Sequence, residues 1–178
     1  TVASGQENLV SGNISSADES EPIGGVTKTG AGTLILSGTN TYTGATDVQV
    51  GTLRAGADTT VFGNNSATTV ATGAFLQLNG FSSNSIGSLA GAGTVENASA
   101  TAATLTTGGD NTSTTFSGVL QDGTGGGALS LTKVGTGTQT LSGANTYTGT
   151  TTIDAGTLEI GGAGTLGSGS YAGTITNN

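Results

Sequence analysis

The sequence predicts an all-β chain whose short strands wind around one axis as a β-solenoid. Three observations support this: abundant glycine and threonine, short apolar stretches that alternate with polar residues, and a long internal repeat. The 178 residues include 34 glycines and one proline, 33% are hydrophobic and only 8% are charged. Glycine without a strict triplet period excludes collagen, and the low charge density argues against disorder. No window shows the i, i+3, i+4 apolar spacing of a helix.

The internal repeat relates residues 26–56 to residues 131–161. Aligned without gaps at an offset of 105, 18 of 31 positions are identical and cluster in the blocks TK, LSG, NTYTG and GTL. Such repetition is typical of arrays in which each unit stacks on its neighbour, because no unit buries its apolar face alone. We divide the single continuous domain into an N-terminal segment or cap, a first long solenoid repeat and a partial second repeat, at 1–25, 26–130 and 131–178.

The strands expected in the first copy are bounded by glycines and lie at 33–36, 46–50 and 52–55. The second copy repeats them at 138–141, 151–155 and 157–160. Strands this short, separated by corners rather than by two-residue hairpin loops, favour a coil that winds around an axis. At roughly 20 residues per coil, the chain makes about eight or nine coils.

Alternation along these strands predicts which side chains face the core. Equivalent positions of the two copies are expected to stack as an internal apolar ladder, namely Leu36 with Leu141, Val48 with Ile153 and Leu53 with Leu158. The pairs expected to face solvent are Asp47 with Thr152, Gln49 with Asp154 and Arg54 with Glu159. Gln139 pairs with Leu34 at an inward position, so it requires either a buried polar partner or a strand edge.

Three residue types recur with the repeat and are therefore expected to serve the scaffold. Lys28 and Lys133 are expected at the surface near a coil corner. Tyr42 and Tyr147 are expected to pack over a corner rather than to form an aromatic sugar-binding ladder. The asparagines of the same block are expected to adopt turn conformations or to stack their amides between coils, and they are Asn40 and Asn145.

The blocks TKTGAGTLILSGTNTYTGATDVQVGTL and TKVGTGTQTLSGANTYTGTTTIDAGTLEIGG closely resemble the passenger-associated strand repeat of bacterial autotransporters. SIGSLAGAGTVEN and TTFSGVLQDGTGGGALSLTKVG are similar to the segments that link such repeats, so the resemblance covers most of residues 26–168. It implies a right-handed parallel β-helix exported by a Gram-negative cell. It also implies a location outside the cell or at the outer-membrane surface, often with a role in adhesion, autoaggregation or biofilm formation.

The charge balance limits the possible partners. The formal charge is −8, from eleven acidic residues against Lys28, Arg54 and Lys133. Three basic residues cannot supply the phosphate contacts of nucleic-acid binding, and they argue against docking on anionic membranes. No apolar run is long enough for a membrane-spanning helix, so we expect no membrane insertion by this segment. Because initiator methionine and a signal-peptide pattern are both missing, we expect a processed product or an excised fragment.

The residue inventory argues against an enzyme. The chain has no histidine and no cysteine, which excludes a Ser-His-Asp mechanism, a cysteine nucleophile and thiolate metal sites. The carboxylates are scattered apart from a cluster expected in a solvated loop before Pro22, at Asp18, Glu19 and Glu21. Residues 108–110 and 122–125 match the calcium-binding β-roll repeat only in part. We therefore predict no enzyme, no catalytic, cofactor-binding or metal-binding residues, and no cofactor.

These observations favour an extracellular structural and adhesive rod whose partners are itself or surface glycans and host matrix. An alternative is a filament subunit, since unpaired first and last coils could stack head to tail. A third hypothesis, an ice-binding solenoid, rests on Thr-x-Thr triplets whose irregular spacing counts against one flat face, at 41–43, 104–106, 138–140, 146–148 and 174–176. An enzyme of unrecognised type would have to use aspartate, glutamate, tyrosine and threonine alone.

Overall fold

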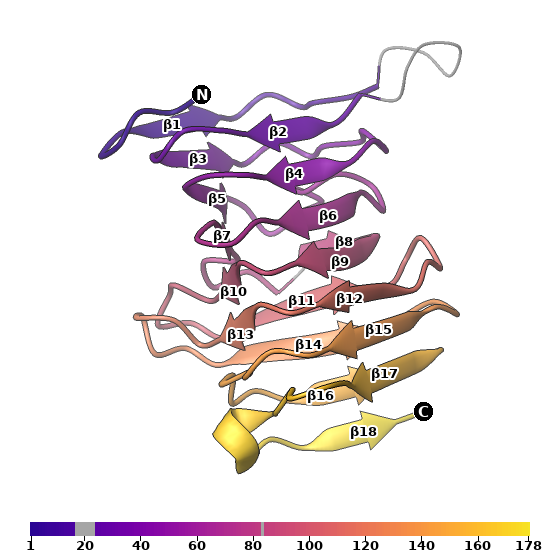
Figure 1. The fold of residues 1–178 in the computed structure, drawn as a ribbon. Helices are drawn as coiled ribbons and strands as arrows, with labels where there is room; N and C mark the ends of the chain where they lie inside the picture. The colour runs from indigo at the N-terminus through magenta and orange to yellow at the C-terminus, as the bar shows by residue number, and fades with distance from the viewer. Residues whose placement is uncertain (17–23, 83) are drawn as a thin grey trace.

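The computed structural model describes residues 1–16, 24–82 and 84–178. Within these residues the chain forms one β-solenoid whose termini lie at opposite ends of the stack (Figure 1). Strands of consecutive coils pair in parallel and in register, as β4 (Thr46–Val48) does with β6 (Ala67–Val70). The helical structure in this part of the chain is a single 3-10 turn, η1 (Gly167–Gly169). The predicted all-β parallel β-helix is therefore confirmed.

Three sheets form the sides of the solenoid. The long sheet runs through the whole stack and contains β2 (Val26–Lys28), β4, β6, β9 (Ser88–Gly91), β12 (Thr114–Phe116), β15 (Thr138–Leu141) and β17 (Thr157–Ile160). The N-terminal sheet contains β1 (Glu7–Val10), β3 (Thr33–Leu36), β5 (Thr52–Ala55), β7 (Phe75–Gln77), β10 (Thr94–Glu96) and β13 (Val119–Gln121). The C-terminal sheet contains β8 (Asn84–Ile86), β11 (Ala103–Thr107), β14 (Leu129–Lys133), β16 (Thr151–Ile153) and β18 (Ile175–Asn177).

The number of turns is close to the predicted number but smaller. The long sheet has seven strands, one for each turn of the solenoid. Coil length varies, because one turn takes the chain from Glu7 to Thr33, whereas the next takes it only from Thr33 to Thr52. Most coils are longer than the period assumed from the sequence, so the stack contains about seven turns rather than eight or nine.

The core lies between the three sheets and is built from inward columns of aliphatic side chains. In the N-terminal sheet, Leu53, Leu76, Val95 and Leu120 follow one another in register, and all four are fully buried. Successive side chains of a strand point to opposite faces, so their neighbours along each strand face outward. The predicted inward positions Leu36, Val48, Leu53 and Leu141 belong to this core, and Leu158 packs against it.

The two repeat copies do not stack on each other, and they occupy different sheets. In the first copy, β2 and β4 lie in the long sheet and β3 and β5 in the N-terminal sheet. In the second copy, the equivalent strands β14 and β16 lie in the C-terminal sheet, and β15 and β17 in the long sheet. The predicted ladder between equivalent residues is therefore wrong. Leu36 pairs with Val10 and Ala55, whereas Leu141 pairs with Phe116 and Ile160.

Two predicted strands end earlier than expected, because a tight turn follows them. Strand β4 stops at Val48 and β16 at Ile153, rather than at residues 50 and 155. The turns contain Gly51 at φ 75° and Gly156 at φ 69°, in the left-handed region that glycine adopts most easily. A Cβ at Gly51 would lie 2.5 Å from backbone oxygens of the preceding coil, so both conformation and space require glycine there.

Candidate functional site

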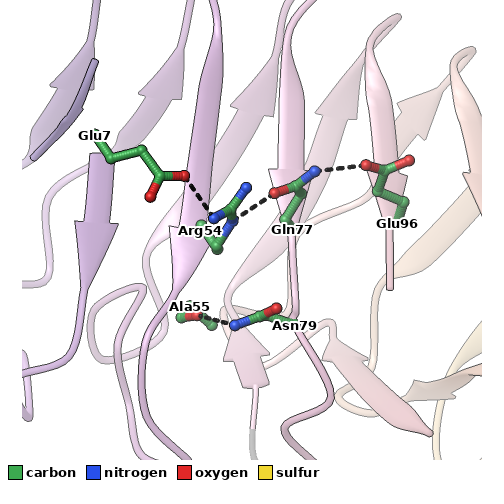
Figure 2. Close-up of polar contacts among 6 residues, drawn as sticks. All are labelled: Glu7, Arg54, Ala55, Gln77, Asn79 and Glu96. Carbon is green, nitrogen blue, oxygen red and sulfur yellow. Dashed lines mark hydrogen bonds and ion pairs between the residues drawn. The ribbon is translucent and has the colours of Figure 1, made fainter. Parts of the chain in front are cut away.

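The outer face of the N-terminal sheet carries long polar side chains, which we call the polar row: Glu7, Arg54, Gln77, Glu96 and Gln121. Figure 2 shows the first four of them. Arg54 Nη1 lies 2.8 Å from Glu7 Oε1, and Arg54 Nε donates to Gln77 Oε1 at 2.7 Å. Gln77 Nε2 and Gln121 Nε2 donate to the two carboxylate oxygens of Glu96 at 2.6 and 2.7 Å. Hydrogen bonds therefore join β5, β7, β10 and β13 along the outside of the sheet, and the Arg54–Glu7 ion pair reaches across β3 to β1.

A second outward array lies on the C-terminal sheet and consists of hydroxyl side chains. Pairing places Thr104 beside Ser130, and Thr106, Thr132, Thr152 and Thr176 in one column. Ser85 lies beside Thr106 at the start of this column. Thr150 lies beside Ser130, to whose Oγ its N–H donates at 3.1 Å. We call these positions the hydroxyl face: Ser85, Thr104, Thr106, Ser130, Thr132, Thr150, Thr152, Thr174 and Thr176.

As predicted, the five Thr-x-Thr triplets do not share one face, but two of them belong to the hydroxyl face. The triplets 104–106 and 174–176 share this face, and Ser130-x-Thr132 and Thr150-x-Thr152 occupy the two coils between them. The triplet 138–140 lies on the long sheet instead, and 41–43 and 146–148 lie in corner segments. The rungs of the hydroxyl face are unevenly spaced in the sequence but adjacent in space, because the coils that separate them differ in length.

The outer surfaces of the other two sheets are mixed in character. On the long sheet the outward row includes Thr27, Asp47 and Thr69 at one end, and Thr115, Thr140 and Glu159 at the other. The predicted solvent-facing positions are confirmed as exposed or half-buried, including Arg54 and Asp154. Among the surfaces built from the described residues, only the hydroxyl face presents one kind of functional group over several consecutive coils.

The two repeated lysines are buried, which corrects the expectation that they lie at the surface. Lys28 Nζ donates to the carbonyl oxygens of Thr29 at 3.3 Å, Gly30 at 2.6 Å and Val50 at 2.9 Å. Lys133 Nζ repeats the arrangement with the carbonyls of Val134 at 2.5 Å, Gly135 at 3.0 Å and Ala155 at 3.3 Å. Each ammonium group therefore joins its own corner to the corner of the next coil.

Burial acts on the ionisation of both lysines. It lowers the pKa of Lys28, and it lowers the pKa of Lys133, where the nearby Asp110 carboxylate partly opposes the shift. The three carbonyl oxygens match the three N–H donors of a charged ammonium group. The arrangement therefore has the form of an internal cation site that the lysine ammonium group fills.

The repeated tyrosines are fully buried, so they pack at corners and present no surface for sugars. Tyr42 Oη lies 2.8 Å from Thr46 Oγ1, and Tyr147 Oη lies 2.8 Å from Thr151 Oγ1. Thr151 Oγ1 is also bonded to Tyr171 Oη at 2.7 Å. Burial raises the pKa of both Tyr42 and Tyr147, although the threonine hydrogen bonds oppose the shift.

Asn40 and Asn145 bridge coils through backbone groups rather than by stacking their amides. Asn40 Oδ1 accepts from the Ile14 N–H at 2.8 Å, and its Nδ2 donates to the Val61 carbonyl at 2.6 Å. Asn145 does the same between the Leu120 N–H and the Thr165 carbonyl, at 3.0 and 3.1 Å. The left-handed conformations expected for asparagine occur elsewhere, at Asn65, Asn79 and Asn111.

Gln139 has the buried polar partner that its inward position requires. Its Nε2 donates to the Leu89 carbonyl at 3.1 Å, and the residue is almost fully buried. Glu96 was not identified from the sequence, although it is 6% exposed and held by two glutamines. Its outward parity next to Val95 is visible in the sequence, but its burial depends on glutamines from the two adjacent coils.

The remaining carboxylates show no clustering suited to a metal ion within the described ranges. Asp110 Oδ1 accepts from the Thr112 N–H at 2.9 Å, and Asp122 Oδ1 accepts from the Leu129 N–H at 2.8 Å. Both carboxylates thus hold loop backbone in place. The predicted acidic loop with Asp18, Glu19 and Glu21 lies outside the described residues. No helix in the described part of the chain is long and apolar enough to cross a membrane.

The repeated region of the chain is similar to known proteins. The passenger-associated-transport-repeat family model matches residues 26–55 and 131–160. The chain is also 40% identical over 139 residues to the adhesin BmaC autotransporter of Brucella suis biovar 1 (strain 1330). That alignment covers 76% of this chain and 4% of the relative, so the chain spans a small part of the relative's length. No solved structure matches the chain.

Proposed function

We propose that the chain acts as an adhesive rod outside the cell or at the outer-membrane surface, because it carries two matches to the passenger-associated-transport-repeat model and is similar to an autotransporter adhesin. The role is passive, because rigid stacked coils hold polar side chains at fixed intervals along the outer faces. The observation that carries the proposal is the in-register repetition of outward polar positions along the long sheet, at Thr27, Asp47 and Thr69 and again at Thr115, Thr140 and Glu159. Repeated weak contacts of this kind add up through avidity.

The partners that fit such a surface are glycans, matrix proteins or a second copy of the rod. The name of the relative, an adhesin, supports this class of function for the chain. Thr69 and Thr115 are exposed on the long sheet and present hydroxyl groups that are suited to hydrogen bonding with polar partners. A strongly basic partner surface would gain further from the formal charge of −8.

A second candidate is a filament subunit, in which a coil of another copy would contact the C-terminal end of the stack. Ile160 and Ile175 occupy inward positions, since they pair with Leu141 and Thr151, yet they are 42% and 55% exposed. Both lie on the last strands of their sheets, where one edge of the backbone has no strand partner in the described part of the chain. Another coil placed on this end would cover the isoleucines and extend the sheets.

One experiment tests both candidates with matched variants. The lateral pair Thr69→Lys and Thr115→Lys changes an outer face, and the end pair Ile160→Lys and Ile175→Lys changes the exposed end. Each protein is attached to beads for clumping and for binding to glycan-coated and matrix-coated surfaces. The same proteins are imaged by negative-stain electron microscopy over a range of concentrations.

An adhesive rod is expected to clump beads or bind coated surfaces, to lose this activity in the lateral variant and to keep it in the end variant. Fibres that lengthen with concentration and vanish only in the end variant would instead assign the filament role. Wild-type beads that neither clump nor bind any coated surface, with rods that never elongate, would reject both candidates.

A further inference from the structure

The hydroxyl face has a two-dimensional repeat that the sequence conceals. Its rungs are Thr104-x-Thr106, Ser130-x-Thr132, Thr150-x-Thr152 and Thr174-x-Thr176. Neighbouring strands of a sheet lie about 4.8 Å apart, and alternate residues of a parallel strand lie about 6.6 Å apart. The side chains therefore form two parallel columns with a fixed interval in each direction.

Threonine makes this array stiff as well as regular. A β-branched side chain has few χ1 rotamers, so the hydroxyl and methyl groups of each residue keep a restricted orientation. The strands beneath are fixed by buried residues on the other side of the sheet, among them Leu105, Leu129 and Leu131. A rigid array binds with little loss of conformational freedom, which favours a ligand that is itself ordered.

Charge and composition narrow the choice of ligand. The chain carries a formal charge of −8, but none of the positions of the hydroxyl face is charged or aromatic. Anionic and cationic polymers find no complementary charge on it, and sugar rings find no aromatic surface for stacking. The ligand that fits the face is therefore uncharged. Its own polar groups repeat in two dimensions, at intervals close to the spacings of the sheet.

We propose that the hydroxyl face binds ice. Water molecules in the ice lattice repeat at intervals close to both spacings of the face, and they accept and donate the hydrogen bonds that threonine hydroxyls offer. The threonine methyl groups would also leave liquid water when the face meets the crystal, which favours binding. Each contact is weak, but all rungs engage the same crystal surface together, so the contacts add up.

This function goes beyond the adhesive role and concerns one face of the rod. The polar row includes the charged side chains of Glu7, Arg54 and Glu96, and the outward row of the long sheet includes the carboxylates of Asp47 and Glu159. Neither surface offers an uninterrupted lattice of neutral groups. Ice binding can therefore be tested with variants that leave the adhesion experiment unaffected.

The test compares changes at the centre of the hydroxyl face with changes on the long sheet. Thr132→Lys and Thr152→Lys place long charged side chains within the second column, whereas Thr69→Lys and Thr115→Lys place them on the other face. Circular dichroism establishes that all variants keep the β fold. Thermal hysteresis, the shape of growing ice crystals and the fraction of protein incorporated into slowly grown ice are then measured.

The wild type and the long-sheet variants are expected to shape ice crystals and to enter the ice, and the hydroxyl-face variants are expected to lose both activities. Wild-type protein that is excluded from ice and leaves crystal shape unchanged would overturn the proposal. Equal activity in folded proteins of both variant classes would overturn it as well. Binding of the inactive wild type to crystalline polysaccharide, lost in Thr132→Lys, would reassign the face to that ligand.

Discussion

A buried ammonium group is stable only where acceptors surround its N–H donors. Lys28 and Lys133 meet this need with backbone carbonyls from two consecutive corners, as the bond from Lys28 to the Val50 carbonyl illustrates. The corners lie beyond the ends of β2 and β14, where the regular strand ladder stops. The lysines therefore link coils at positions that sheet hydrogen bonds do not reach.

Replacing Lys133 by methionine removes the donors but keeps the length of the side chain. We expect Lys133→Met to lower the free energy of unfolding by about 1–3 kcal/mol, the cost of leaving buried polar groups unsatisfied. Lys28→Met should have a similar effect, because the same three-carbonyl arrangement is lost. Urea denaturation followed by circular dichroism measures the change.

Arg54→Met provides the matched control, since it also replaces a basic side chain by methionine. Arg54 lies in the polar row at the surface, where an ion pair contributes less than about 1 kcal/mol. If the lysine variants were as stable as the wild type, the carbonyls would be satisfied by other means and the structural role assigned to the ammonium groups would be wrong.

Sequence reasoning located these residues but not their environment. The recurrence of Lys28 and Lys133 correctly indicated a role in the scaffold, whereas the general tendency of lysine to remain exposed gave the wrong location. The acceptor from Val50 belongs to the next coil, so the complete arrangement appears only once the coils are stacked. Gln139 was easier to interpret, because strict alternation along one strand placed it inside.

Strand ends depend on conformations that alternation does not reveal. The pattern Val48-Gln49-Val50 continues the apolar alternation, yet β4 ends at Val48 and Val50 is 48% exposed. The chain turns at Gly51, whose positive φ and close contact with the preceding coil leave no room for a side chain. The glycine was visible as a break, but its effect on the two residues before it was not.

A series of alanine substitutions separates conformational strain from steric contact. Gly51→Ala and Gly156→Ala combine positive φ with a Cβ only 2.5 Å from backbone oxygens. Gly73 has φ 78° with open space around it. Gly73→Ala should therefore lower the free energy of unfolding by only about 1–2 kcal/mol, the cost of placing an L-residue in the left-handed conformation. Gly12→Ala, with neither constraint, should leave stability nearly unchanged.

In thermal denaturation, the melting temperature should therefore fall most for Gly51→Ala and Gly156→Ala. It should fall by an intermediate amount for Gly73→Ala and hardly at all for Gly12→Ala. If Gly51→Ala behaved like Gly73→Ala, the contact with the preceding coil would be flexible enough to accept a methyl group. The ranking then would reflect backbone conformation alone.

Similar strands of the two copies form in different sheets. Local sequence therefore determines the strands and corners but not the sheet that each strand joins. The block NTYTG…GTL produces the same strands and corners in both copies, and these were predicted from the residues. Which side of the solenoid a strand occupies depends on the coils between the copies, where β8, β9 and β10 add a third strand to the turn. Residues 57–130, which lie between the two matched copies, therefore determine which sheet the strands of the second copy join.

At the level of the whole stack, the parallel solenoid was predictable from composition and repetition, but its outer surfaces were not. Unequal coil lengths place unrelated segments side by side, so Thr104 and Ser130 become neighbours without any regular period in the sequence. The polar row has the same origin, since Arg54, Gln77 and Glu96 come from three different coils.

Stability should also vary along the stack, because each coil contacts only its neighbours. Interior strands such as β9 and β10 are bonded on both sides, whereas β17 and β18 each pair with one strand. Side-chain burial follows the same trend, since Leu89 and Val95 are fully buried but Ile160 and Ile175 are largely open to solvent. The C-terminal coils therefore have both fewer hydrogen bonds and a weaker core.

Hydrogen exchange measured by mass spectrometry should resolve this gradient. We expect peptides from residues 88–116 to exchange most slowly and peptides from residues 157–178 to exchange first, because opening the last coil disrupts one interface rather than two. Ile160→Lys should speed exchange within residues 138–178 and leave residues 84–107 unchanged, as the change is confined to the terminal coils. Uniform protection from β2 to β18, lost everywhere at once in this variant, would instead show that the solenoid unfolds as one cooperative unit.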